Sequence, residues 1–126
     1  MTETEQAERK AEEQATATEI LRQLGGRRFV AMTGARNFIN DHGALTFRLP
    51  GGGFTRNGIN YVRIELTPAD LYKMTFNRCR WQPRGGHWQA PVVVAEADGI
   101  YNDQLQAVFE ETTGLATSLN MGRATA

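Results

Sequence analysis

The sequence contains a single cysteine and lacks any long run of apolar residues. Because Cys79 has no second cysteine to pair with, no intramolecular disulfide can form, and we expect a reducing compartment. No apolar stretch approaches the roughly 18 residues that a membrane-spanning helix needs. The first residues, MTETEQAERK, are acidic and polar, whereas signal and transit peptides are basic and apolar. We therefore expect a cytoplasmic protein with no membrane partner.

A chain of 126 residues with 40% hydrophobic and 22% charged residues has the composition of an ordinary globular protein. This length favours one domain, which can form a core without disulfides or metal. We assign that domain to residues 16–119. Residues 1–15 include good helix formers but no apolar face to bury, so we expect a frayed or disordered acidic lead-in. Residues 120–126 are expected to form a loose tail.

The net charge of zero conceals a separation of charge along the chain. Residues 21–92 contain eleven basic and three acidic residues, a net charge of +8, and ten of the eleven are arginine. Residues 1–20 have six acidic against two basic residues, and residues 93–126 have five against one, so each segment carries −4. This separation indicates either an anionic partner for the middle segment, or acidic helices that pack beside a basic sheet and neutralise it.

Apolar periodicity predicts a helix, a sheet and a second helix along the chain. Thr16-Ala17-Thr18-Glu19 has capping-box spacing and Gly25-Gly26 can end a helix, so a helix is expected between them. A second helix is expected from Ile100 to Gly114. Strands are predicted at residues 29–39, 44–49, 60–66, 73–76 and 92–95, with one helical turn at 67–70. Within the first of these, residues 33–37 are compatible with a strand, a bulge or a helical turn. The expected class is α+β, with a mostly antiparallel sheet of four or five strands flanked by the N-terminal and C-terminal helices.

Arginine and tryptophan are interleaved within residues 77–91, a segment too polar and too rich in proline and glycine to form core. Arginine can bind phosphate through two hydrogen bonds, and exposed aromatic rings stack on the bases of single strands. Arginines on the polar side of neighbouring strands extend the same surface. The residues predicted to bind nucleic acid are Arg48, Arg63, Arg78, Arg80, Trp81, Arg84 and Trp88. No known nucleic-acid-binding motif accompanies them.

Other interpretations of residues 77–91 stay open. Tryptophan and arginine are also enriched at the energetic centres of protein–protein interfaces. A host or phage protein is therefore the alternative partner, and a contact between copies in a homo-oligomer is another. The simplest structural interpretation is a surface loop whose tryptophans pack on the edge of the domain.

Catalytic and metal-binding patterns have little support in the sequence. His42 and His87 lie far apart in predicted loops, and Cys79 has no CxxC partner, so a zinc site would need an unusual combination of all three. No base is evident that would activate Cys79 as a nucleophile. We therefore predict a non-enzymatic protein without metal or cofactor.

Among the segments of this sequence, Met32-Thr33-Gly34-Ala35-Arg36 is the one whose role in packing is least obvious. Thr33 and Arg36 are candidates for a ligand site in which the backbone of Gly34 is approached closely. The favoured interpretation is a β-bulge that bends a long strand so that the N-terminal helix can cover it.

Three segments of the sequence resemble those of a known protein family: ILRQLGGRRFVAMTGARNF at 20–38, INYVRIELTPADLYKMTF at 59–76 and IYNDQLQAVFEETTGL at 100–115. They resemble a family of small uncharacterised proteins of temperate phages and conjugative mobile elements, most specifically in the QLGG-x-x-F-x-x-MTGA phrase. The resemblance implies an accessory protein that acts inside a bacterial host cell, and it implies no catalytic residue. The segment formed by residues 77–91 is longer than the corresponding segment in members of the family.

Overall fold

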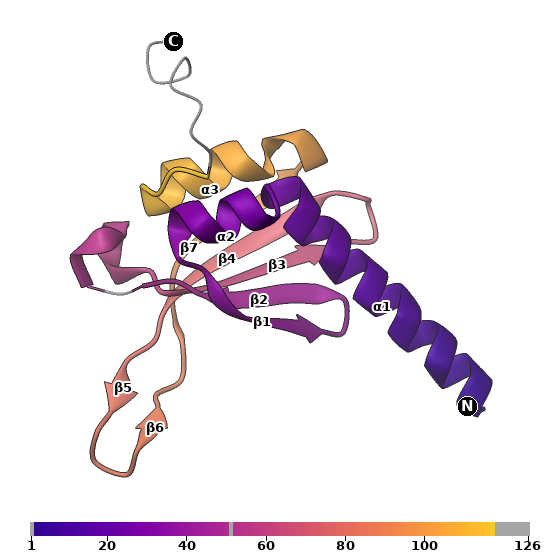
Figure 1. Ribbon diagram of the computed structural model, residues 1–126, viewed down its shortest axis with the longest axis horizontal. Helices are drawn as coiled ribbons and strands as arrows, with labels where there is room; N and C mark the ends of the chain where they lie inside the picture. The colour runs from indigo at the N-terminus through magenta and orange to yellow at the C-terminus, as the bar shows by residue number, and fades with distance from the viewer. Residues whose placement is uncertain (1, 51, 118–126) are drawn as a thin grey trace.

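A five-stranded antiparallel sheet, with strand order β1-β2-β3-β4-β7, forms the centre of the computed structural model, which describes residues 2–50 and 52–117. Three helices pack on one face of this sheet (Figure 1). The strands are β1 (Arg36–Asp41), β2 (Ala44–Arg48), β3 (Tyr61–Leu66), β4 (Tyr72–Arg78) and β7 (Val92–Ile100). The helices are α1 (Glu3–Leu24), α2 (Arg27–Thr33) and α3 (Leu105–Thr113). The predicted α+β class, with an antiparallel sheet between N-terminal and C-terminal helices, is confirmed.

Helix α1 begins much earlier than the sequence analysis predicted. Thr2 is the N-cap, and its hydroxyl oxygen accepts a 3.2 Å hydrogen bond from the backbone N–H of Glu5. Thr16 lies inside the helix, where its hydroxyl donates to the carbonyl of Glu12 at 3.0 Å instead of capping. Residues 3–15, predicted as a frayed or disordered lead-in, are therefore helical. This part of the helix forms although it has no apolar face to pack. Its residues have high helix propensity, and the acidic residues in its first turn interact favourably with the helix dipole.

Helix α2 replaces the first part of a predicted strand. The apolar run that begins at Phe29 was assigned to a strand, but in the structure Phe29 and Thr33 lie one helical turn apart and are both buried. Gly34 ends the helix in the left-handed conformation, at φ 74°, and its N–H donates to the carbonyl of Val30 at 2.9 Å. Strand β1 begins only at Arg36. A short apolar run is compatible both with the helical period of about 3.6 residues and with the strand period of about two, so periodicity alone does not distinguish strand from helix here.

The core lies between the sheet and the helices and is centred on phenylalanine. The ring of Phe29 is 5.4 Å from that of Phe47 and 5.0 Å from that of Phe109, both in edge-to-face geometry. All three side chains, and that of Phe76, are fully buried. Around them pack apolar residues from α1 and the sheet, including Ile20, Leu24, Leu45, Val62, Ile64 and Met74. Helix α1 enters the core only through its second half, because its residues 3–12 are exposed.

The connection between β3 and β4 is a tight turn and not the predicted helical turn. Leu66 pairs with Tyr72, which leaves a short loop. The N–H and hydroxyl of Thr67 both donate to the carbonyl of Leu71, at 2.8 and 2.9 Å. Asp70 reverses the chain at φ 61°. The N–H of Asp70 donates to the carbonyl of Thr67 at 3.0 Å, so residues 67–70 form a single hydrogen-bonded turn that does not have helical structure.

Strand β7 is longer than predicted, and α3 starts later. The predicted strand ended at residue 95, but β7 continues to Ile100, with a left-handed Gly99 at φ 64° inside it. A short 3₁₀ turn (Asn102–Gln104) then leads into α3, whose predicted end at Gly114 is confirmed by a left-handed φ of 81°. Two further 3₁₀ turns, Gly52–Phe54 and Arg56–Gly58, lie between β2 and β3. The loose tail predicted at residues 120–126 lies outside the described residues.

Candidate nucleic-acid interface

The face of the sheet opposite the helices carries mainly polar side chains. Leu45, Ile64 and Met74 are paired with one another across β2, β3 and β4, and their side chains point toward the helices. Because side chains alternate along a strand, the residues that precede and follow each of them point to the opposite face of the sheet. That face comprises Thr46, Arg48, Tyr61, Arg63, Glu65, Lys73, Thr75, Asn77 and Glu96, together with the exposed apolar residues Ile39 and Val93. We call it the open face, because α1, α2 and α3 all lie on the other side of the sheet (Figure 1). The predicted Arg48 and Arg63 are both on it.

Residues 79–91 form a small hairpin that projects from the end of the sheet (Figure 1). Its strands are β5 (Trp81–Gln82) and β6 (His87–Trp88), in which Trp81 pairs with Trp88. The two indole rings meet edge to face, with centroids 5.3 Å apart. Both stay accessible, at 49% exposure for Trp81 and 44% for Trp88. The segment that looked irregular in sequence is therefore ordered by a cross-strand tryptophan pair.

Arg48 connects this hairpin to the open face. Its guanidinium carbon lies 4.2 Å from the centre of the Trp88 ring and 5.3 Å from that of Tyr61. Tyr61 is the cross-strand partner of Arg48 in the sheet. The Nη1 atom of Arg48 is buried and makes no hydrogen bond within residues 2–50 and 52–117. Its charge is therefore stabilised mainly by the faces of aromatic rings.

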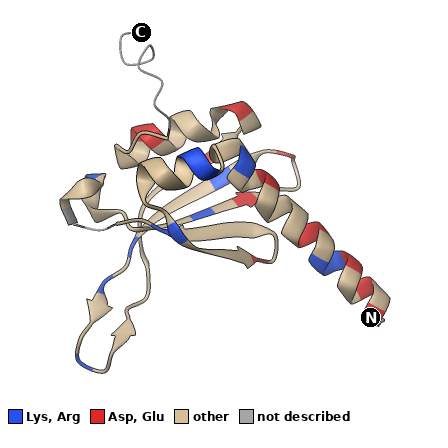
Figure 2. Ribbon diagram, viewed as in Figure 1, with Lys and Arg blue, Asp and Glu red and all other residues tan. Residues whose placement is uncertain are grey.

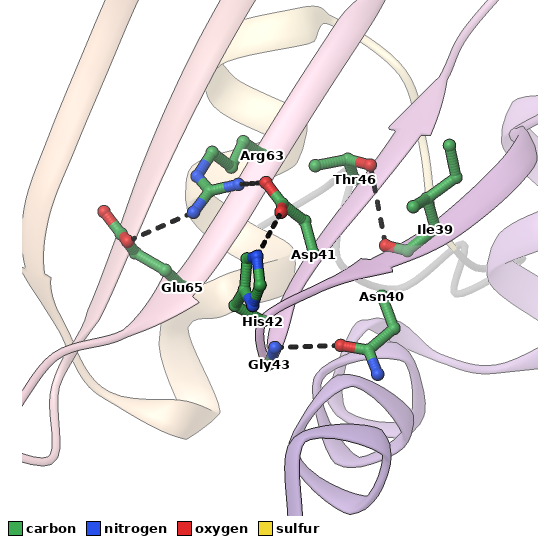
Figure 3. Close-up of polar contacts among 8 residues, drawn as sticks. All are labelled: Ile39, Asn40, Asp41, His42, Gly43, Thr46, Arg63 and Glu65. Atoms are coloured by element: carbon green, nitrogen blue, oxygen red, sulfur yellow. Dashed lines mark hydrogen bonds and ion pairs between the residues drawn. The ribbon is translucent and has the colours of Figure 1, made fainter. Parts of the chain in front are cut away.

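Arg63 lies in the next row of the open face, opposite Thr46, and its side chain is already paired. Its Nη1 atom donates a short hydrogen bond to Oδ2 of Asp41, and its Nη2 atom lies 3.7 Å from Oε2 of Glu65 (Figure 3). The side chain is 33% exposed, so part of its charge faces the two carboxylates instead of solvent. The prediction grouped Arg63 with the hairpin arginines, but the structure places it apart from them and opposite two acids.

The turn between β1 and β2 positions Asp41 for this contact. Asn40 accepts a 2.8 Å hydrogen bond from the N–H of Gly43 through its side-chain oxygen, which closes the turn (Figure 3). His42 adopts a left-handed conformation at φ 53°, and its Nε2 atom is 3.9 Å from Oδ1 of Asp41. Since Asp41 comes from a different strand than Arg63, only the sheet pairing brings the two together, and the sequence gives no signal for it.

The remaining predicted arginines lie in the hairpin or at its base. Arg78 is the last residue of β4 and packs against Gly58, where an added Cβ would lie 3.1 Å from its Cδ. Arg80 and Arg84 are exposed, and neither makes an ion pair within the described part of the chain. Figure 2 shows basic residues on the hairpin, whereas many of the acidic residues lie on α1 and α3. Six of the seven predicted residues therefore lie in the hairpin or next to it: Arg48, Arg78, Arg80, Trp81, Arg84 and Trp88.

Cys79 and the two histidines do not meet. Cys79 is buried, and its backbone exchanges two 2.7 Å hydrogen bonds with the side-chain amide of Asn60. His42 lies at the turn before β2, whereas His87 lies on the hairpin that contacts the other end of β2. Among the described residues, no group of three histidine, cysteine, aspartate or glutamate side chains is arranged to hold a metal ion.

The Thr33–Arg36 segment is the junction between α2 and β1. The hydroxyl of Thr33 donates to the carbonyl of Phe29 at 2.7 Å and accepts from the N–H of Ala35 at 3.2 Å. An irregularity in strand pairing lies between Arg36 and Ile39. The predicted bulge at Met32–Arg36 is wrong, because Met32 and Thr33 belong to α2 and no strand runs through this segment; the irregularity in β1 lies further along the chain. Thr33 instead ends a helix.

No family model, no curated protein and no solved structure matches this chain. The resemblance to phage and mobile-element proteins therefore stays a prediction. Within residues 2–50 and 52–117, no helix is both long enough and apolar enough to cross a membrane. The functional proposal consequently rests on the geometry of the open face and the hairpin.

Proposed function

We propose that this protein is a non-enzymatic accessory factor, of phage or mobile-element origin, that binds single-stranded nucleic acid. The observation that carries the proposal is the exposed pair of Trp81 and Trp88 beside Arg48. Unpaired arginines at the base and tip of the same hairpin, Arg80 and Arg84, supply charge for the phosphate backbone. The origin rests on the sequence resemblance alone.

The arrangement suits single strands better than duplexes. A base stacked on an exposed aromatic ring contributes about 1–3 kcal/mol, and its face is available only when it is not stacked within a duplex. The edge-to-face geometry of Trp81 and Trp88 leaves each ring partly accessible. Arginines that flank the rings are placed to contact phosphates on either side of a stacked base. Arg63 is not part of this surface, because it is paired with Asp41.

Anisotropy of labelled oligonucleotides tests the proposal. Single-stranded DNA, single-stranded RNA and a duplex are titrated with the protein at about 50 mM and about 200 mM salt, because phosphate contacts make affinity depend steeply on salt. The test variant is Arg80→Ala/Trp88→Ala. The matched control is Arg27→Ala/Phe54→Ala, which removes the same kinds of exposed side chain elsewhere.

The expected result is tighter binding of single strands, weakened by salt, and reduced at least about tenfold by the test variant only. Absence of binding at low salt, or binding that salt and the test variant leave unchanged, contradicts the proposal. In that case the alternative is favoured, in which the hairpin binds an acidic surface of a host or phage protein.

A further inference from the structure

A groove of about 460 Å³ lies between the second half of α1 and α2, on the solvent-facing side of the helices. Its walls include Leu21 from α1 and Val30 and Ala31 from α2. Leu21 and Val30 are half-buried and pack against the core, whereas Ala31 is exposed. A groove of this size is within the range that accepts apolar anchors from a ligand or a partner.

The groove is present because small residues line the place where α1 and α2 meet. The helices are joined by Gly25 and Gly26, at φ 125° and 59°, so the chain reverses without a side chain at the junction. A Cβ added at Gly26 would meet no atom within 4 Å. With Thr18 and Ala31 on the two walls, no large side chain from residues 2–50 and 52–117 fills the space.

The rim of the groove is basic. Arg27 lines it, and Arg28 follows on α2; both are exposed, and neither makes an ion pair with any described residue. Arg22 also lines the groove but is paired with Glu19 at 2.5 Å. Helix α2 contains no acidic residue, so the charge of its two arginines is not compensated within the helix.

We propose that this groove binds an acidic amphipathic helix of a partner protein. Apolar side chains of the partner occupy the groove beside Leu21, Val30 and Ala31, and its carboxylates lie against Arg27, which lines the groove. The exposed Arg28, next to Arg27 in the sequence, adds to the positive charge. Binding of an amphipathic helix in an apolar groove is a common recognition mode, and the positive charges at the rim favour a partner with negative charge. This site lies on the helical side of the sheet, away from the open face, so it is independent of the proposed nucleic-acid surface (Figure 1).

A second copy of this chain fits the groove poorly. Its most acidic helical segment is the first half of α1, ETEQAERKAEEQ, which has only alanine as an apolar residue. Such a segment complements the arginines but has no large side chain to fill the groove. The amphipathic helix α3 already packs its apolar residues Leu105 and Phe109 in the core. A foreign partner is therefore the better occupant.

A designed peptide tests the site directly. The probe is a labelled helical peptide of about sixteen residues with leucine at i, i+4, i+7 and i+11 and glutamate and alanine elsewhere. Its control has the same composition with the leucines distributed around the helix. Two independent protein variants are used: Ala31→Phe, which fills the groove, and Arg27→Glu/Arg28→Glu, which reverses the charge of the rim. All three substituted positions are exposed, and circular dichroism checks that each variant folds.

The expected result is that the probe binds the unaltered protein, that the control peptide does not, and that each variant weakens binding at least about tenfold. The hairpin variant Arg80→Glu/Arg84→Glu should bind the probe normally. Equal binding of both peptides, or binding that only the hairpin variant abolishes, overturns the proposal. So does a dimer of the protein alone, detected by sedimentation, that Ala31→Phe dissociates, because a second copy then occupies the groove.

Discussion

The guanidinium of Arg48 lies over the rings of both Trp88 and Tyr61, with its carbon 4.2 Å and 5.3 Å from their centres. Through this contact a residue of the sheet holds a residue of the projecting hairpin. Because the hairpin strands β5 and β6 are only two residues each, the pairing between them is too short to fix the position of the hairpin by itself. We infer that Arg48 presents Trp88 and Trp81 in a defined orientation, and the first prediction tests this coupling.

A double-mutant cycle between Arg48→Met and Trp88→Ala should show a coupling of about 0.5–1 kcal/mol in the free energy of unfolding, the value expected for a partly exposed cation–π pair. Urea denaturation measures it. The control cycle pairs Arg48→Met with Phe54→Ala, an exposed aromatic on another loop, and should be additive. Additivity of the Arg48 and Trp88 substitutions would show that the two side chains do not stabilise each other.

The pairing of Arg63 with Asp41 and Glu65 predicts that Arg63 contributes little to nucleic-acid binding. Arg63→Ala should change the affinity for a single-stranded oligonucleotide less than about twofold, because no free charge is lost. Arg84→Ala, which removes an exposed and unpaired charge, should lower the slope of log affinity against log salt by about 0.7. Anisotropy titrations at several salt concentrations measure both. A loss with Arg63→Ala as large as that with Arg84→Ala would place Arg63 on the binding surface.

The buried ring of Phe109 should be among the main contributors to stability. It contacts Phe29, Phe47 and Phe76, with ring centroids 5.0 to 6.5 Å away. Phe109→Ala should lower the free energy of unfolding by about 3–5 kcal/mol, because it leaves a cavity in a packed core. The same substitution at Phe54, which is 74% exposed, should change it by less than about 0.5 kcal/mol. Thermal and urea unfolding of the two variants make the comparison.

The backbone at Gly34 should tolerate no side chain. Its φ is 74°, and an added Cβ would lie 2.9 Å from Cγ of Pro50. Gly34→Ala should therefore combine left-handed strain of about 1–2 kcal/mol with a clash. Gly99 has a similar φ of 64° but open space around it, so Gly99→Ala should show the strain alone. Equal losses of unfolding free energy for the two variants would show that Pro50 moves aside without cost.

Glu19 should titrate far below an ordinary glutamate. Hydrogen bonds from Arg22, and next from Gln23, lower the pKa of its carboxyl from 4.5 to about 2. Since the pKa in the folded state lies below that of the unfolded chain, the associated stability is present above pH 4.5 and is lost as the pH falls through about 2. Arg22→Ala should raise the pKa of Glu19 toward 4.5, whereas Arg27→Ala should leave it near 2. Carboxyl NMR titration reads the value, and an unchanged pKa in Arg22→Ala would contradict the assigned cause.

Much of the sheet could be predicted from the sequence because its strands alternate. In β3, Val62 and Ile64 are buried while Tyr61, Arg63 and Glu65 face the other side, as the period of two requires. The glycine ends of α1 and α3 were also predicted correctly, because left-handed φ values at Gly25 and Gly114 follow from local chemistry. The tryptophan and arginine composition of residues 77–91 pointed to the hairpin surface without predicting its strands.

By itself, then, the sequence determined the features that depend on local pattern: the alternating strands, the helix ends and the separation of charge along the chain. Tertiary structure alone decided that Phe29 lies on a helix, because a short apolar run satisfies either period until its burial partners Phe47 and Phe109 are in place. It likewise decided that Arg63 pairs with Asp41 while Arg48 stacks on Trp88. The physical reason is that an arginine's role depends on which charges and rings come near it in space, and sheet pairing brings together residues that are distant in sequence.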